Sequence, residues 1–178
     1  MSENEKASVL FVDDEPGVLK ALARVIPDEP YEVRTCEDPE RALEEIMQNA
    51  PTVVVADFYM PKMNGPALLK KVRALDEAIV RMVLTGKPDV TAVLDAVKQG
   101  SIYRFLLKPW DEDELKMSLL QALDHHRLLR ERDTLLASLQ RHRQTAENLE
   151  ESHPGITALP KRQGGAYVLS EKDLPKSR

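Results

Sequence analysis

The sequence has little of what secreted, disulfide-stabilised or membrane-embedded proteins require. Cys36 is the single cysteine among 178 residues, which excludes a disulfide framework and a cysteine-based metal site. No segment approaches the ~20 apolar residues that a membrane-spanning helix needs. Residues 1–6 are polar and acidic, unlike a secretory signal. These absences predict a protein of a reducing, cytoplasmic compartment, with no membrane partner.

Positively charged residues are also fewer than negatively charged ones. The chain has 25 Lys and Arg against 30 Asp and Glu, a formal net charge of −5, so nucleic acid is not an expected partner. The arginines of residues 127–143 are interrupted by Glu131 and Asp133, which favours a solvated helix face over a nucleic-acid-binding stripe. The hydrophobic share of 42% suffices for one core, and the length predicts about one domain plus an appendage.

Glycine and proline recur from Pro16 to Pro109, where they separate short apolar segments. Helix starts are predicted at Pro16, at Asp38-Pro39 and at Asn64-Gly65-Pro66. A fourth helix is predicted around residues 90–97, ending at Gly100. The predicted strands alternate with these helices and cover residues 9–12, 31–35, 53–56, 79–84 and 103–107. This alternation predicts an α/β fold, a doubly wound five-stranded parallel sheet with helices on both faces.

Residues 110–153 contain neither glycine nor proline, and we expect one long helix over residues 111–150, capped by Asp111 with Glu114 three residues later. Such a helix is ~60 Å long at 1.5 Å per residue, so it is expected to project beyond the sheet domain. Its later apolar positions follow coiled-coil spacing and predict a homodimer through this helix. They are Leu128, Leu135, Leu139, Ala146 and Leu149.

Polar side chains stand where four of the predicted strands end: Asp13-Asp14, Asp57, Thr85 and Lys108. Ligands of such a sheet bind at the carboxyl ends of its strands. Three ionised carboxylates in one crevice repel each other unless a cation intervenes, and oxygen-only ligands suit Mg²⁺. Asp57 could then attack a phosphoryl group while Lys108 and the metal offset its charge.

Four segments at these strand ends carry a resemblance to the receiver domain of bacterial two-component response regulators. They are Val12–Glu15, Asp57–Gly65, Leu84–Gly86 and Phe105–Pro109. The resemblance implies a flavodoxin-like receiver at residues 8–126. Around it we expect a disordered N-terminus at residues 1–7, a fifth receiver helix continuing into the coiled coil at 111–150, and a flexible tail at 151–178.

The resemblance also implies roles for single residues. Asp57 is expected to be the phosphoacceptor, and Mg²⁺ is expected on Asp13, Asp14, Asp57 and the backbone carbonyl of Tyr59. Thr85 would be the switch hydroxyl, Phe105 the switch aromatic, and Lys108 the contact to the phosphoryl oxygens. The expected partner is a sensor histidine kinase. The expected output runs through the 4-5-5 face, formed by the fourth helix, fifth strand and fifth helix, and through the coiled coil.

Three residues are expected to modulate the site: Tyr103, Tyr59 and Lys87. The switch aromatic Phe105 lacks the hydroxyl that many family members carry at its position, and Tyr103 could supply one nearby. Tyr59 and Lys87 each stand two residues after a site residue, at positions that flank the phosphoryl group in the family. We expect the bulky Tyr59 to hinder water and to prolong the phosphorylated state.

Rival functions differ in class. A phosphohydrolase of the haloacid dehalogenase type would need a second acid at the position of Tyr59, so we expect no enzyme beyond a receiver that catalyses its own phosphorylation and dephosphorylation. A phosphorylation-independent adaptor or dimerisation protein remains an alternative. So does a receiver fragment whose enzymatic or DNA-binding output domain is absent. The adjacent His125 and His126 are interpreted as structural, because neighbouring helix residues point apart.

Overall fold

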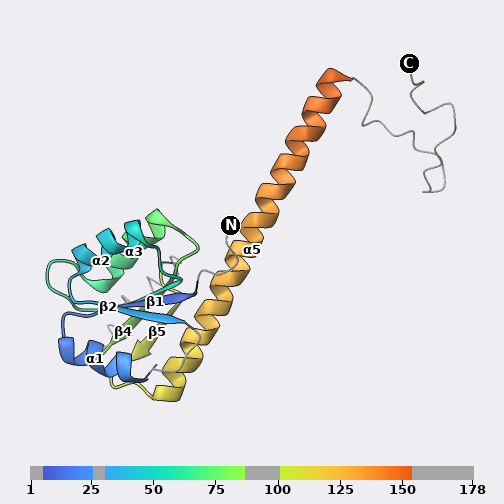
Figure 1. The fold of residues 1–178 in the computed structure, drawn as a ribbon. Helices are drawn as coiled ribbons and strands as arrows, with labels where there is room; N and C mark the ends of the chain where they lie inside the picture. Colours follow the sequence, from blue (N-terminus) through green and yellow to red (C-terminus); the bar gives the residue numbers. More distant parts are fainter. Residues whose placement is uncertain (1–5, 26–30, 87–100, 154–178) are drawn as a thin grey trace. The chain divides into compact units, whose positions relative to one another are not determined.

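The computed structural model describes residues 6–25, 31–86 and 101–153. Five strands form one parallel sheet in the order β2-β1-β3-β4-β5 (Figure 1). The strands are β1 (Ser8–Val12), β2 (Glu32–Cys36), β3 (Val53–Asp57), β4 (Val80–Thr85) and β5 (Arg104–Leu107). The helices are α1 (Pro16–Val25), α2 (Pro39–Gln48), α3 (Gly65–Leu75) and α5 (Glu112–Ser152). The predicted doubly wound parallel sheet is confirmed, and the predicted fourth helix lies outside the described residues.

Strand composition follows strand position. β1, β3 and β4 are buried at every residue, as expected for inner strands of a parallel sheet covered on both faces. β2 lies at one edge, and its residues are exposed or half-buried, with none fully buried. It begins one residue later than the sequence indicates, at Glu32, and includes Cys36, which pairs in register with Val12.

The two faces of the sheet have separate hydrophobic cores because strand side chains alternate. Phe11 of β1 packs with α1 and with the start of α5, through Leu22 and Leu119. Leu10, the preceding residue, packs on the other face with α2 and α3. Figure 1 shows the same division, with α2 and α3 on one side of the sheet and α1 on the other.

Polar side chains cap three helices at or beside their predicted starts. The Asp38 carboxylate accepts hydrogen bonds from the backbone N–H groups of residues 40 and 41 at the start of α2. Asn64 accepts from Ala67 N at 2.9 Å at the start of α3, and Asp111 accepts from Glu114 N at 2.9 Å. Each cap satisfies N–H groups that have no partner within the helix.

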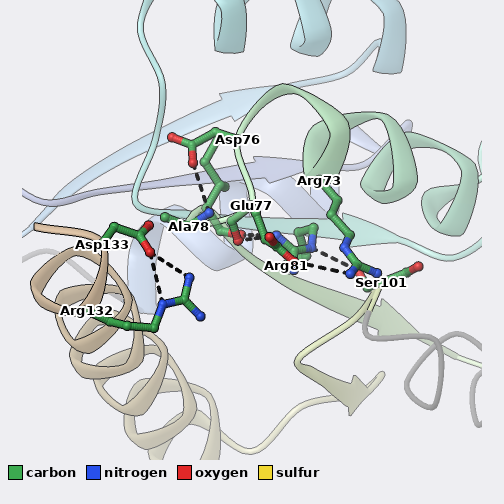
Figure 2. A network of polar contacts seen from close by, with 9 residues as sticks. Arg73, Asp76, Glu77, Ala78, Arg81, Ser101, Arg132 and Asp133 are labelled. Atoms are coloured by element: carbon green, nitrogen blue, oxygen red, sulfur yellow. Dashed lines mark hydrogen bonds and ion pairs between the residues drawn. The ribbon is translucent and has the colours of Figure 1, made fainter. Parts of the chain in front are cut away.

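A buried arginine ties the beginning of β4 to the segment before β5 (Figure 2). Arg81 lies on β4 and is 8% exposed. Its guanidinium donates to the backbone carbonyls of Glu77 and Ser101, both at 3.0 Å, and to that of Ile79. These carbonyls belong to two chain segments, so the side chain fixes where β5 starts relative to β4.

The long C-terminal helix is confirmed as one continuous element of 41 residues, α5. Its first part packs through Leu115, Leu119 and Ala122, which are fully buried, as the sequence predicts. The chain divides into two compact units, with the boundary between Glu131 and Arg132. Within the described part of the second unit, Leu135, Leu136, Leu139 and Leu149 are 65%, 51%, 64% and 45% exposed.

Candidate functional site

The carboxyl ends of β1, β3, β4 and β5 bring the predicted site residues to one edge of the sheet. Val12 pairs with Ala56, which places the following residues, Asp13 and Asp57, beside each other. Thr85 ends β4, and Lys108 directly follows β5. The backbone N–H of Lys108 donates to the carbonyl of Thr85 at 2.8 Å. The parallel topology therefore determines which polar side chains meet.

The centre of the site is the Lys108 ammonium, which contacts two carboxylates at once. Its Nζ lies 2.6 Å from Asp13 Oδ2 and 2.6 Å from Asp57 Oδ1. The side chains of Lys108, Asp13 and Asp57 are only 16%, 2% and 9% exposed. Two largely buried negative charges thus share one positive charge, which offsets much of the cost of removing them from water.

The remaining oxygen of each carboxylate accepts a backbone hydrogen bond. Asp13 Oδ1 accepts from Glu15 N at 2.9 Å, and Asp57 Oδ2 accepts from Tyr59 N at 2.8 Å. Both carboxylates are therefore held in a fixed orientation before any ligand arrives, a property that favours chemistry on the Asp57 oxygens.

Burial and charge act against each other on the ionisable groups. Burial has the largest influence on the pKa of the Asp13 carboxyl and raises it, although the Lys108 ammonium acts to lower it. Burial alone would lower the pKa of Lys108, but its hydrogen bonds to Asp13 and Asp57 outweigh burial and raise it. The stabilisation from this lysine is therefore present at neutral pH and is lost only as pH rises past the ordinary lysine pKa.

The donor chemistry fits a divalent cation. Two largely buried carboxylates share one ammonium, so the site keeps an excess of negative charge and a further cation at these oxygens would be favoured. Mg²⁺ uses one or two carboxylates and keeps several waters, a requirement that Asp13 and Asp57 meet. Asp14 is exposed and lines a groove with Thr35 and Cys36. In the described part of the chain, no three His, Cys, Asp or Glu side chains are grouped as metal ligands.

Thr85 has a buried hydroxyl with no hydrogen-bond partner within the described residues. The residue is 0% exposed, and its Oγ1 is unsatisfied. Such groups are rare in folded proteins because each loses its bonds to water without replacement. A hydroxyl in this state at the end of β4 is suited to bind an oxygen atom that enters the site.

The residues predicted to modulate the site have different surroundings. Phe105 is 39% exposed on β5, and Tyr59 is 58% exposed. Tyr103 directly precedes β5, and Lys108 directly follows it, so the two residues lie at different ends of the strand. The Tyr103 ring stacks on the His125 ring, with centroids 4.7 Å apart. Lys87 lies outside the described residues. His126 Nδ1 contacts the carbonyl of Ala78 at 2.7 Å, so both histidines make contacts within the fold.

Gly65 stands against the backbone of the residue at the centre of the site. A Cβ atom at this position would lie 2.2 Å from the carbonyl oxygen of Asp57 and 3.0 Å from its carbonyl carbon. The sequence marks Gly65 as part of a turn, but nothing in the pattern shows this close approach. The glycine allows α3 to begin directly beside Asp57.

Comparison with known proteins agrees with this geometry. The response regulator receiver domain model matches residues 9–120. The chain belongs to the response regulator receiver domain family. The receiver is homologous to response regulators of two-component systems, in which phosphorylation of an aspartate is the general mechanism. The predicted family and the predicted flavodoxin-like fold are both confirmed.

Individual relatives share the receiver. The hydrogenase transcriptional regulatory protein HoxA of Cupriavidus necator is 34% identical over 121 residues, which cover 68% of this chain and 25% of that protein. The C4-dicarboxylate transport transcriptional regulatory protein DctD of Pseudomonas aeruginosa is 33% identical over 138 residues, covering 77% and 30%. The chain thus spans between a quarter and a third of the length of these two curated relatives.

A solved receiver shows the same fold. The signal receiver domain of an HD domain-containing protein from Pseudomonas fluorescens has a TM-score of 0.69 and 32% identity to this chain, covering 74% of this chain and 97% of that one.

No helix within the described residues is long and apolar enough to cross a bilayer.

Proposed function

We propose that this receiver accepts a phosphoryl group on Asp57 from a sensor histidine kinase and acts as a phosphorylation-driven switch. The observation that carries the proposal is the Lys108 ammonium, which contacts both Asp57 and Asp13 in a largely buried site. A carboxylate oxygen of Asp57 forms the new P–O bond, and the P–N bond to the phosphohistidine of the kinase breaks. Lys108 is placed to offset charge on the transferring oxygens.

The residues that would hold Mg²⁺ are Asp13, Asp14, Asp57 and the backbone carbonyl of Tyr59. When bound, the ion supplies positive charge to the phosphoryl oxygens. Asp13 and Asp57 already face a cation in the structure. Asp14 follows Asp13 directly in the sequence and is exposed, so its carboxylate is free to turn toward an ion at Asp13.

Thr85 and Phe105 are proposed to transmit the signal. The Thr85 hydroxyl has no partner in the described part of the chain and gains an acceptor when a phosphoryl oxygen occupies the site. This new hydrogen bond favours a conformation with Thr85 drawn toward Asp57. Phe105 lies two residues before Leu107, which pairs with Thr85 in register. A shift of Thr85 therefore acts on the strand that carries Phe105, the strand proposed to belong to the 4-5-5 face.

The last part of α5 is proposed to pair with a second copy of this chain. Leucines at Leu135, Leu139 and Leu149 stay exposed and recur at coiled-coil spacing when residues 142 and 146 are included. An apolar stripe of this kind favours a partner helix. The coiled coil, the homodimer and the cytoplasmic location stay predictions, as does the absence of an enzymatic role beyond the receiver's own phosphorylation.

Phosphorylation of Asp57 can be tested directly by intact mass. After incubation with acetyl phosphate and Mg²⁺, the wild type is expected to gain the mass of one phosphoryl group. Asp57→Ala is expected to gain none because it has lost the attacking oxygen, and Asp124→Ala, which removes an exposed acid on α5 outside the site, should gain the group like the wild type. Equal labelling of wild type and Asp57→Ala would contradict the proposal.

Tyr59 provides a second test because its backbone N–H contacts the Asp57 carboxylate and its side chain is 58% exposed. Replacing Tyr59 with Asn keeps the backbone N–H that holds Asp57 Oδ2 but removes the bulky ring. The phosphorylated variant is expected to lose its phosphoryl group several-fold faster than wild type when decay is followed by intact mass. An unchanged or slower decay would reject the shielding role of the ring.

The coiled coil can be tested by sedimentation equilibrium. Leu139→Asp places a charge on the apolar stripe and is expected to shift the protein toward monomer. Gln140→Asp adds the same charge one residue away from the stripe and should leave association unchanged. If Leu139→Asp and wild type associate equally, the helix is not the dimer interface; measurements with and without acetyl phosphate show whether association depends on phosphorylation.

A further inference from the structure

The loop between β3 and α3 contains a strained turn close to Asp57. Lys62 has φ of 66°, a left-handed conformation that non-glycine residues seldom adopt. Met63 N donates to the carbonyl of Pro61 at 2.7 Å, which closes a three-residue turn centred on Lys62. A turn of this kind with positive φ at its centre is rare and strained, so it persists where neighbouring contacts hold it.

The Lys62 side chain supplies such a contact. Its ammonium lies 2.5 Å from Asp38 Oδ2 and 4.0 Å from Glu40 Oε2. The other oxygen of Asp38 accepts from the N–H groups of Glu40 at 2.8 Å and Arg41 at 3.3 Å. The carboxylate that receives Lys62 is therefore fixed as the N-cap of α2. The hydrogen bond from Lys62, and then that from Glu40 N, lower the pKa of Asp38, so the pair is ionised at neutral pH.

The same loop holds the carboxylate of Asp57. Tyr59 N donates to Asp57 Oδ2, and Gly65 N donates to the carbonyl of Phe58 at 3.1 Å. These two bonds fix the base of the loop next to the site. The pair between Lys62 and Asp38 fixes the outer part of the loop, three residues beyond Tyr59, to a different element of the fold. A relaxed turn at Lys62 would displace the segment that orients Asp57.

We propose that Asp38 and Lys62 are positioning residues for the phosphorylation site, which hold the strained turn and through it the Tyr59 backbone against Asp57. This role rests on the proposed function of Asp57, although neither residue touches the site. Lys62 is 58% exposed and Asp38 28% exposed, so the effect is modest in size. It also weakens as salt screens the pair.

The test uses the hydrogen-exchange protection of the Tyr59 amide, measured by NMR without Mg²⁺ or a phosphodonor. Lys62→Gln removes the ammonium, and Asp38→Asn removes the charge while keeping a side chain that caps α2. Each is expected to lower Tyr59 protection by roughly three- to fivefold, the scale of an exposed ion pair, and the double variant should be no worse than either single one. Lys62→Arg should restore protection, and Lys70→Gln, an exposed lysine on α3, serves as the matched control.

Two further measurements follow the effect of ionic strength on Tyr59 protection and the rate at which Asp57 is phosphorylated. Raising the ionic strength to ~1 M, where the screening length is ~3 Å, should bring wild-type protection toward that of Lys62→Gln. The rate of labelling by acetyl phosphate should fall in Lys62→Gln by the same factor as the protection. Unchanged Tyr59 protection in both single variants would overturn the positioning role. A wild type that is never labelled, with protection responding as expected, would instead show that the proposed function of Asp57 is wrong.

Discussion

One ammonium between two buried carboxylates is the interaction on which the site depends. Asp13 and Asp57 come from neighbouring strands and are nearly inaccessible to water. Without a cation, their like charges would repel and burial would disfavour both. Lys108 reaches them from the end of β5, so its ammonium can neutralise the two carboxylates only when β5 is correctly placed in the sheet. Arg81 helps to place β5 because it ties the segment before β5 to the beginning of β4.

The charge balance also prepares the site for change. Each carboxylate has one oxygen on the ammonium and one on a backbone N–H, while the Thr85 hydroxyl at the end of β4 has no partner within the described residues. A phosphoryl group on Asp57 would add negative charge and new acceptor oxygens at this point. Lys108 would then exchange a carboxylate oxygen for a phosphoryl oxygen, and the Thr85 hydroxyl would gain an acceptor. Thr85 ends β4 and Lys108 follows β5, the strand that carries Phe105.

The sequence predicts the part of the site that depends on regular structure. Apolar runs locate the inner strands, and each run ends at a residue of the candidate site, so the meeting of Asp13, Asp57, Thr85 and Lys108 follows from parallel topology alone. Sequence could not separate Asp13 from Asp14, which are adjacent and identical in type. Only the backbone direction at the end of β1 makes one buried and the other exposed.

Long-range polar contacts gave no usable signal in the sequence. Asp38 and Lys62 are 24 residues apart, and each has an ordinary local explanation, as a helix cap and as a loop lysine. Arg81 interrupts an apolar strand and is buried because its guanidinium meets three carbonyls that only the folded chain brings together. The close approach of Gly65 to Asp57 likewise depends on where α3 begins in space rather than on the turn pattern.

The most direct measurement is the free energy of unfolding of Lys108→Met by urea denaturation, with and without Mg²⁺. If the ammonium neutralises two buried carboxylates, the variant should lose about 3 kcal/mol in the absence of metal. Asp13→Asn added to it should recover part of that loss, and Mg²⁺ should stabilise Lys108→Met more than wild type. A variant as stable as wild type, with Mg²⁺ stabilising the two proteins equally, would contradict the account.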